Sequence, residues 1–188
     1  MRKRWSHIIG FDDGAFDSKH RGDVLLVGAV YANLRLEGVL SGEVKRDGSN
    51  ATDRIIQLVQ QSRFAGHLHA ILLQGVAVAG FNVVDLRFVH AQLTVPVIAV
   101  ARNKPNYAAI KRALLNNVPG GQRKWRLIED LGPMEAVAGV YVQYVGIEAR
   151  DVETIIKRFS VHSDLPEPIR TAHLIASGVT LGESRHRP

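Results

Sequence analysis

The chain has 188 residues, 46% hydrophobic and 22% charged, which is typical of one globular domain, and we expect residues 1–188 to form a single domain. No apolar segment approaches the roughly 20 residues of a membrane span, and the absence of cysteine excludes disulfides and thiolate metal sites, so we expect a cytoplasmic protein with no membrane partner. The surplus of 24 Lys and Arg over 18 Asp and Glu, a net charge of +6, suits contact with phosphates, although many basic proteins bind no nucleic acid.

The first third of the chain has the pattern of three consecutive strands. Residues 6–11 form a short apolar run that ends in the acidic pair Asp12 and Asp13. Residues 24–31 are rich in β-branched and apolar side chains, and residues 34–44 alternate between apolar and polar. Short turns between such strands favour antiparallel neighbours, so this part of the chain predicts an antiparallel meander.

From residue 50 onward, helical patterns alternate with short buried strands. Helices are predicted over 50–64, 82–93 and 106–116, and buried strands over 69–73 and 96–101. This alternation requires parallel pairing of the strands, with right-handed crossovers through the helices.

The last third begins with a polar, Gly-rich stretch at 119–122 and then returns to regular patterns. They predict a helix or turn to residue 130, a strand over 137–147, a helix over 151–159 and a last helix from about 166 to 177. A meander followed by two strand–helix units is the order of an RNase H-like sheet. We therefore expect an α/β fold with a mixed five-stranded sheet, strand one near its centre, flanked by helices and followed by a C-terminal strand and helices.

Five short segments, in order over nearly the whole chain, carry distinctive motifs. They read IGFDDGAF at 9–16, DGSNAT at 47–52, LQGVAVAGFNVVD at 73–85, PVIAV with a later PN at 96–106, and PEPIRTAH with a later GESR at 166–185. Together they resemble an uncharacterised family related to endonuclease V. The resemblance implies an RNase H-like fold and, through the more distant kinship with endonuclease V, DNA or RNA as partner and Mg²⁺ or Mn²⁺ as cofactor.

In nucleases of this fold, carboxylates at the end of strand one and on nearby elements hold metal ions, which activate water and stabilise charge at the phosphate. The resemblance makes Asp12 the expected strand-one ligand and Asp47 a second metal-binding and catalytic carboxylate. Asp12-Asp13-Gly14 and Asp47-Gly48 are also ordinary turn sequences, so a structural role stays open for both carboxylates.

Gln74 departs from the family pattern, which has Asp before this Gly and uses it as a metal ligand. A neutral amide oxygen binds a divalent cation less strongly than a carboxylate does, and Asn50 is a second change from acid to amide. We read Asp85 as a helix cap. We therefore expect a nucleic-acid-binding protein, a Mg²⁺-dependent phosphodiesterase that is weakened or inactive; the alternative is a non-catalytic binding or regulatory protein on the same fold.

Several further residues are expected to contact the substrate. His173, expected to act as acid, base or ligand, lies three residues after Arg170 on one face of the last helix. Gly75 and Asn82 bound a Gly-rich loop whose backbone amides suit an anion, and Arg185 lies in the tail. The same loop supports a third reading, an enzyme acting on a small phosphorylated molecule.

Overall fold

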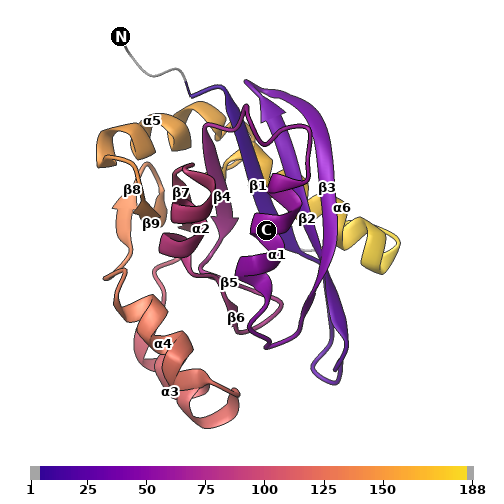
Figure 1. Ribbon diagram of the computed structural model, residues 1–188, viewed down its shortest axis with the longest axis vertical. Coiled ribbons are helices and arrows are strands. Elements are labelled where there is room, and N and C mark those ends of the chain that lie inside the picture. The colour runs from indigo at the N-terminus through magenta and orange to yellow at the C-terminus, as the bar shows by residue number, and fades with distance from the viewer. Residues whose placement is uncertain (1–4, 186–188) are drawn as a thin grey trace.

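The structure, a computed structural model, describes residues 5–185 (Figure 1). The strands of the main sheet are β1 (His7–Asp13), β2 (Asp23–Ala32), β3 (Arg35–Lys45), β4 (Ala70–Gln74), β7 (Val97–Ala101), β8 (Glu135–Val137) and β9 (Val140–Val145). A separate ribbon pairs β5 (Ala77–Val78) with β6 (Asn82–Val83). The helices are α1 (Ala51–Gln60), α2 (Leu86–Leu93), α3 (Tyr107–Asn117), α4 (Gly121–Glu129), α5 (Ala149–Phe159) and α6 (Glu167–Leu181).

The sheet order is β3-β2-β1-β4-β7-β9-β8, which confirms the predicted RNase H-like arrangement. Strand β1 lies between its antiparallel neighbour β2 and its parallel neighbour β4, and β7 continues in parallel. The sheet has seven strands where five and a C-terminal strand were predicted, because the strand expected over 137–147 is replaced by two, β8 and β9, and both belong to the sheet. Strand β9 pairs antiparallel with β7, and β8 folds back on β9, so both extend the sheet. That pairing joins distant segments and has no local sequence signal.

Helices cover both faces of the sheet, and the alternation of side chains along β1 divides them between two cores. Ile9 and Phe11 face the core beneath α1 and α2, whereas Ile8 faces the core beneath α5 and α6. Asp12 continues the second set and therefore points to the α6 side of the sheet. None of the helices within residues 5–185 is long and apolar enough to cross a membrane.

Helix α6 packs directly against β1 because Gly10 leaves room for its backbone. A Cβ atom at Gly10 would lie 2.4 Å from the backbone nitrogen of Ile169, far inside van der Waals contact. This close approach fixes α6 over the central strand, and the following turn of the helix brings His173 over the end of β1.

The predicted helix over residues 82–93 begins later than expected. Asn82 and Val83 form β6, and Asp85 is the N-cap of α2, where its Oδ1 accepts a hydrogen bond from the Phe88 amide at 2.9 Å. Asp85 therefore has the capping role that the sequence indicates, but Asn82 is not part of the helix.

Candidate functional site

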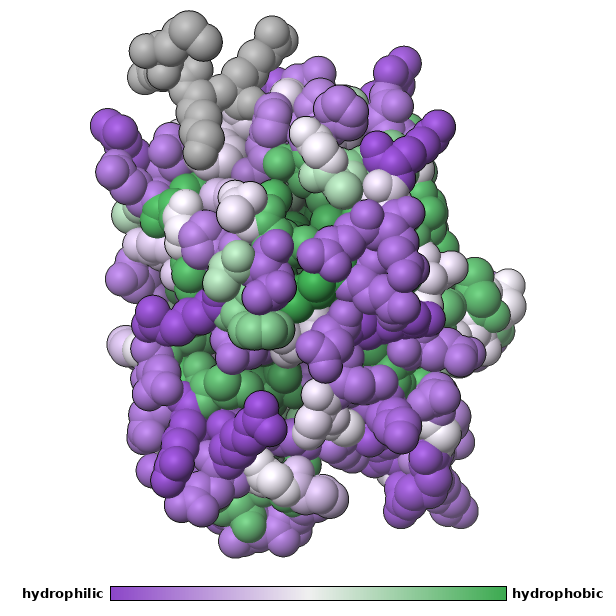
Figure 2. All heavy atoms as spheres, in the orientation of Figure 1, coloured by the Kyte–Doolittle hydropathy of each residue, from purple (hydrophilic) through white to green (hydrophobic). Residues whose placement is uncertain are grey.

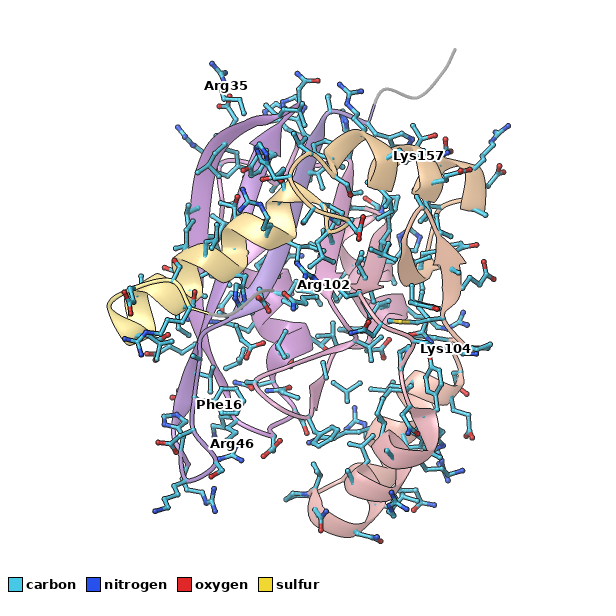
Figure 3. The ribbon with its side chains drawn as sticks, turned by 180° about the vertical axis from the view of Figure 1, so that it is seen from behind. Phe16, Arg35, Arg46, Arg102, Lys104 and Lys157 are labelled. Atoms are coloured by element: carbon cyan, nitrogen blue, oxygen red, sulfur yellow. The ribbon has the colours of Figure 1, made fainter. Side chains whose placement is uncertain are left out.

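A hollow of about 370 Å³ opens at the carboxyl ends of β1 and β4, on the side covered by α6 (Figure 3). Phe11 pairs in register with Leu73, so the next residues in the two strands, Asp12 and Gln74, end side by side. We call this the carboxyl-edge hollow; its lining residues are Asp12, Asp13, Gly14, Ala15, Phe16, Gln74, His173, Ser177 and Arg185. Four of the residues predicted from the sequence, namely Asp12, Gln74, His173 and Arg185, are brought together here.

Asp12 and His173 form a hydrogen-bonded pair in this hollow. His173 Nδ1 lies 2.8 Å from Asp12 Oδ2, and Asp12 is 5% exposed. Burial raises the pKa of Asp12 above its ordinary value, while the hydrogen bond from His173 opposes that rise. A buried carboxylate of this kind favours a nearby cation, and the hydrogen bond fixes the orientation of the imidazole.

Asp13, which the sequence reading passed over, also lines the hollow. Burial and then the neighbouring charge of Asp12 raise the pKa of Asp13 to about 7, although a hydrogen bond from the Ala79 amide stabilises its ionised form. Two adjacent carboxylates therefore compete for ionisation near neutral pH. The acidic pair was visible in the sequence, but a shared hollow for both side chains was not, because successive residues of a strand ordinarily point to opposite faces.

The raised pKa of Asp13 predicts a specific pH dependence of stability. Between about pH 4 and 7 the folded state retains a proton that the unfolded state has lost, so stability should fall as pH rises, by up to about 1.4 kcal/mol per pH unit. The amide introduced by the variant Asp13→Asn cannot ionise, so the variant should lose this slope and exceed the natural protein in stability at pH 8. Urea unfolding of both proteins at pH 5 and 8 without metal measures the pH dependence and the stability at pH 8. The same change with pH in the two proteins would contradict a raised pKa of Asp13.

Gln74 offers an open acceptor to the hollow. Its Oε1 is buried and has no hydrogen-bond partner among residues 5–185. Together with the carboxylates of Asp12 and Asp13 it gives a set of hard oxygen donors, the type that Mg²⁺ and Mn²⁺ prefer. No group of three His, Asp or Glu side chains in the described part of the chain is placed to hold a metal ion. The donors therefore fit one hard cation, held by fewer charges than the family pattern provides.

Arg102, a second residue that the sequence reading missed, lies beside these strand ends. Val100 pairs with Gln74, and Arg102 follows directly after the end of β7 at Ala101. Figure 3 shows its side chain at the centre of the molecule, near the end of the sheet. Its Nε is buried without a hydrogen-bond partner among residues 5–185, which makes it a donor available to an oxyanion.

Asp47 lies outside the carboxyl-edge hollow, contrary to the expectation of a shared metal site. Its Oδ1 accepts a hydrogen bond from the Phe81 amide at 2.8 Å, and its Oδ2 lies 3.3 Å from Arg46 Nε. Its backbone has φ of 50°, in the left-handed region that turn residues adopt. The carboxylate thus holds the loop before β6, which is the turn role that the sequence left open.

The other predicted substrate contacts are dispersed. Asn82 is fully buried, and its amide binds the Ala51 amide and the Lys45 carbonyl, so it is committed to the core. Arg170 forms an ion pair with Glu167 at 2.9 Å, one helical turn before His173. Gly75 lies beside Gln74 but lines a different, apolar cavity.

Comparison with known proteins identifies the family of this chain. A family model described as Endonuclease dU matches residues 4–180. The chain belongs to the Endonuclease dU family. Its relatives include a UPF0215 protein of Deinococcus radiodurans, 54% identical over 96% of this chain and 92% of the relative, and one of Methanothermobacter thermautotrophicus, 43% identical over 95% and 89%.

Solved structures agree with this family assignment. A protein of unknown function from Archaeoglobus fulgidus is 31% identical over 94% of this chain and 98% of its own, with a TM-score of 0.86. Endonuclease V of Ciona intestinalis, solved with DNA containing an inosine, is 13% identical over 94% and 86%, with a TM-score of 0.60. At that identity the likeness establishes a shared fold, and it confirms that this Endonuclease dU family member is related in fold to endonuclease V.

Proposed function

We propose that this Endonuclease dU family member binds nucleic acid and is a weak, divalent-metal-dependent phosphodiesterase acting at the carboxyl-edge hollow. The proposal rests on three oxygen donors that line this hollow. They are the buried Asp12 carboxylate, the half-buried Asp13 carboxylate and the Gln74 amide oxygen, which has no hydrogen-bond partner among residues 5–185. Such donors at the end of a central strand attract a hard cation. A bound Mg²⁺ or Mn²⁺ would supply Lewis-acid activation and stabilise negative charge at a phosphate.

The chain's own residues provide the remaining chemistry. Asp12 holds the ring of His173 through Nδ1, which positions the imidazole to donate or accept a proton at the hollow. Arg185 lines the same hollow, and Arg102 offers an N–H that has no partner among residues 5–185. Both guanidinium groups suit the non-bridging oxygens of a phosphodiester, because Arg donates from a planar fork.

The neutral side chain of Gln74 favours low activity. One missing negative charge about 4 Å from a divalent cation removes on the order of 8 kcal/mol of attraction at an effective dielectric of 20. This same observation supports the second candidate, a non-catalytic nucleic-acid-binding or regulatory protein. A cleavage assay on labelled single- and double-stranded DNA and RNA, with Mn²⁺, Mg²⁺ or a chelator, separates the two: metal-dependent cutting supports the first, and binding without cutting supports the second.

An apolar cavity of about 190 Å³ beside the hollow supports recognition of an extruded base. It begins at Gly75, directly after Gln74, and Phe81, Tyr107 and Met134 are among its lining residues. Enzymes that act at a particular base turn it out of the stack and hold it in a pocket with apolar walls and a few polar contacts. The cavity has this character.

Gln143 is the polar group that would read such a base. It lies in the wall of the cavity and is 3% exposed. Its Nε2 donates to the Gly132 carbonyl, which fixes the orientation of the amide, and its Oε1 is buried without a partner among residues 5–185. A fixed acceptor favours a ring N–H. Uracil and hypoxanthine carry that donor where cytosine and adenine carry an acceptor, so deaminated bases fit the site.

The variant Gln143→Leu should lose discrimination between uracil and cytosine. A buried hydrogen bond whose removal leaves a polar group unpaired is worth about 1–3 kcal/mol, so the preference should fall by roughly tenfold or more. Competition binding with oligonucleotides that differ in a single dU or dC measures the change. An unchanged preference in a folded variant would show that Gln143 does not read the base.

A further inference from the structure

The helical hairpin formed by α3 and α4 stands beside the carboxyl-edge hollow and carries a concentrated positive charge. Its two helices contain five basic residues and one acidic residue. Figure 1 shows the hairpin projecting below the sheet, and Figure 2 shows hydrophilic side chains over much of this lobe. The two helices therefore carry a net formal charge of +4.

The exposed arginines of the hairpin have no carboxylate partner. Arg112, Arg123 and Arg126 form no ion pair within residues 5–185. At the opposite end of the molecule the cations are neutralised locally: Arg35 pairs with Glu37, Arg150 with Glu148, and Lys157 with Glu153. Figure 3 shows Arg35 and Lys157 at that far end. These three paired cations at the far end contrast with the three arginines of the hairpin, which have no carboxylate partner within residues 5–185.

The position of two cations in α4 opposes helix stability. Arg123 and Lys124 lie in its first turn, where the helix dipole favours acidic residues, and the N-cap Gly120 offers no side-chain hydrogen bond. Lys124 is also 4% exposed, and burial lowers its pKa. Cations placed at the positive end of a helix repel that end but strengthen its attraction for an external anion.

The hairpin is held firmly enough to present these charges. A Cβ atom at Gly121 would lie 1.8 Å from the Leu114 carbonyl oxygen, so the two helices meet at backbone contact. Lys111 Nζ lies 5.0 Å from the centroid of the Trp125 ring and 3.8 Å from Glu129 Oε1, and these contacts tie α3 to α4. The arginines therefore project from a packed element.

A single arginine, Arg46, lies near the Phe16 side of the hollow. Arg46 lies over the ring of Phe16, which lines the hollow, with 5.3 Å between its guanidinium carbon and the ring centroid. Figure 3 shows these two side chains across the strand ends from the hairpin. Arg46 is itself paired with Asp47, with 3.3 Å between Arg46 Nε and Asp47 Oδ2, so of Arg46 and the three hairpin arginines only the latter lack a carboxylate partner within residues 5–185.

We propose that the α3–α4 hairpin is a phosphate-binding arm that holds the nucleic-acid backbone at a distance from the hollow. The inference rests on the proposed function for the identity of the polyanion and extends it with a second contact surface. Arg112, Arg123 and Arg126 contact backbone phosphates without reading sequence, as exposed Lys and Arg do in nucleic-acid complexes.

The test compares two triple variants with equal loss of charge. The arm variant removes three positive charges from the hairpin by combining Arg112→Gln, Arg123→Gln and Arg126→Gln. The far-end variant removes three positive charges at the opposite end by combining Arg35→Gln, Arg150→Gln and Lys157→Gln. Fluorescence anisotropy with labelled single-stranded and duplex DNA, in chelator and from about 50 to 200 mM salt, gives the slope of log K against log [salt]. The arm variant should lose about 2 from this slope on single strands and about 3 on duplex, while the far-end variant keeps the natural slope.

A triple exchange of the same arginines to lysine should keep the slope, because lysine preserves the charge, and thermal melting checks that each variant is folded. Three results would each overturn the proposed arm. They are a folded arm variant that keeps the natural slope, an equal loss of slope in the two glutamine variants, and a natural protein that binds no nucleic acid. Arm-dependent binding without metal-dependent cleavage would retain the arm and reject the phosphodiesterase. Metal-dependent cleavage together with binding that does not depend on the arm would reject the arm and retain the phosphodiesterase.

Discussion

The variant Gln74→Asp is expected to cleave nucleic acid about 10–100-fold faster than the natural protein when the metal is limiting. The new carboxylate supplies the negative charge that the hollow lacks, at the strand end where Gln74 already presents an unsatisfied oxygen. Stronger attraction for a divalent cation raises occupancy of the site, and metal-site changes of this kind commonly alter affinity or activity by one to two orders of magnitude. Metal titrations of the cleavage rate, together with calorimetric titration of Mn²⁺ into the free protein, measure the effect.

The variant Gln74→Asn is the matched control, because its side chain has the shape of the aspartate without the charge. It should show no gain in metal affinity or in rate. Equal behaviour of the two variants would show that charge at this position does not limit the reaction. A gain in Mn²⁺ affinity without any cleavage would favour the non-catalytic binding protein.

The variant Asp12→Asn is expected to lose at least about 100-fold in cleavage while it remains folded. The exchange keeps the size of the side chain and removes the one carboxylate that both lines the hollow and orients His173. Loss of a group that acts on developing charge typically reduces rates by about 10²–10³. Cleavage rates on one labelled substrate, measured at saturating Mn²⁺, give the comparison.

Stability separates a functional role of Asp12 from a structural one. Burial raises the pKa of Asp12, so its ionised form is unfavourable in the folded state, and a neutral amide should leave stability at pH 8 unchanged or higher. Binding of DNA in chelator should also persist, because removing a negative charge weakens no attraction for phosphate. A clear drop in stability with unchanged cleavage would assign Asp12 to the core.

The order of the elements could be predicted from the sequence because it is expressed locally. Apolar runs and alternating residues marked the first strands, and helical stripes marked α1, α3 and α5, each within a few residues of its boundaries. The same local reading placed Asp12 at the end of strand one, and the family resemblance singled out Gln74 at the end of the adjacent strand. Both residues lie where motif and pattern coincide.

Other features depended on pairing between distant segments. The predicted C-terminal strand joins the main sheet as β8 and β9 through hydrogen bonds to β7 and to each other, and no local pattern states a strand's partner. Asp47 was expected in the site, but its turn conformation and the Phe81 amide use its carboxylate elsewhere. Long-range contacts decided these positions, since a side chain's direction depends on the exact register of its backbone.

By itself the sequence determined the family resemblance and the order of strands and helices, and the resemblance implied an exchange of acid for amide at Gln74. Only the tertiary structure decided that Asp13 and Arg102 approach the same strand ends, and that Gln143 lines a cavity with its Oε1 buried and without a hydrogen-bond partner among residues 5–185. Those placements depend on burial and on contacts such as the hydrogen bond from the Ala79 amide to Asp13 and the one from Gln143 to the Gly132 carbonyl. Because such interactions form only when strands pair and helices pack, they leave no periodic signal in the sequence.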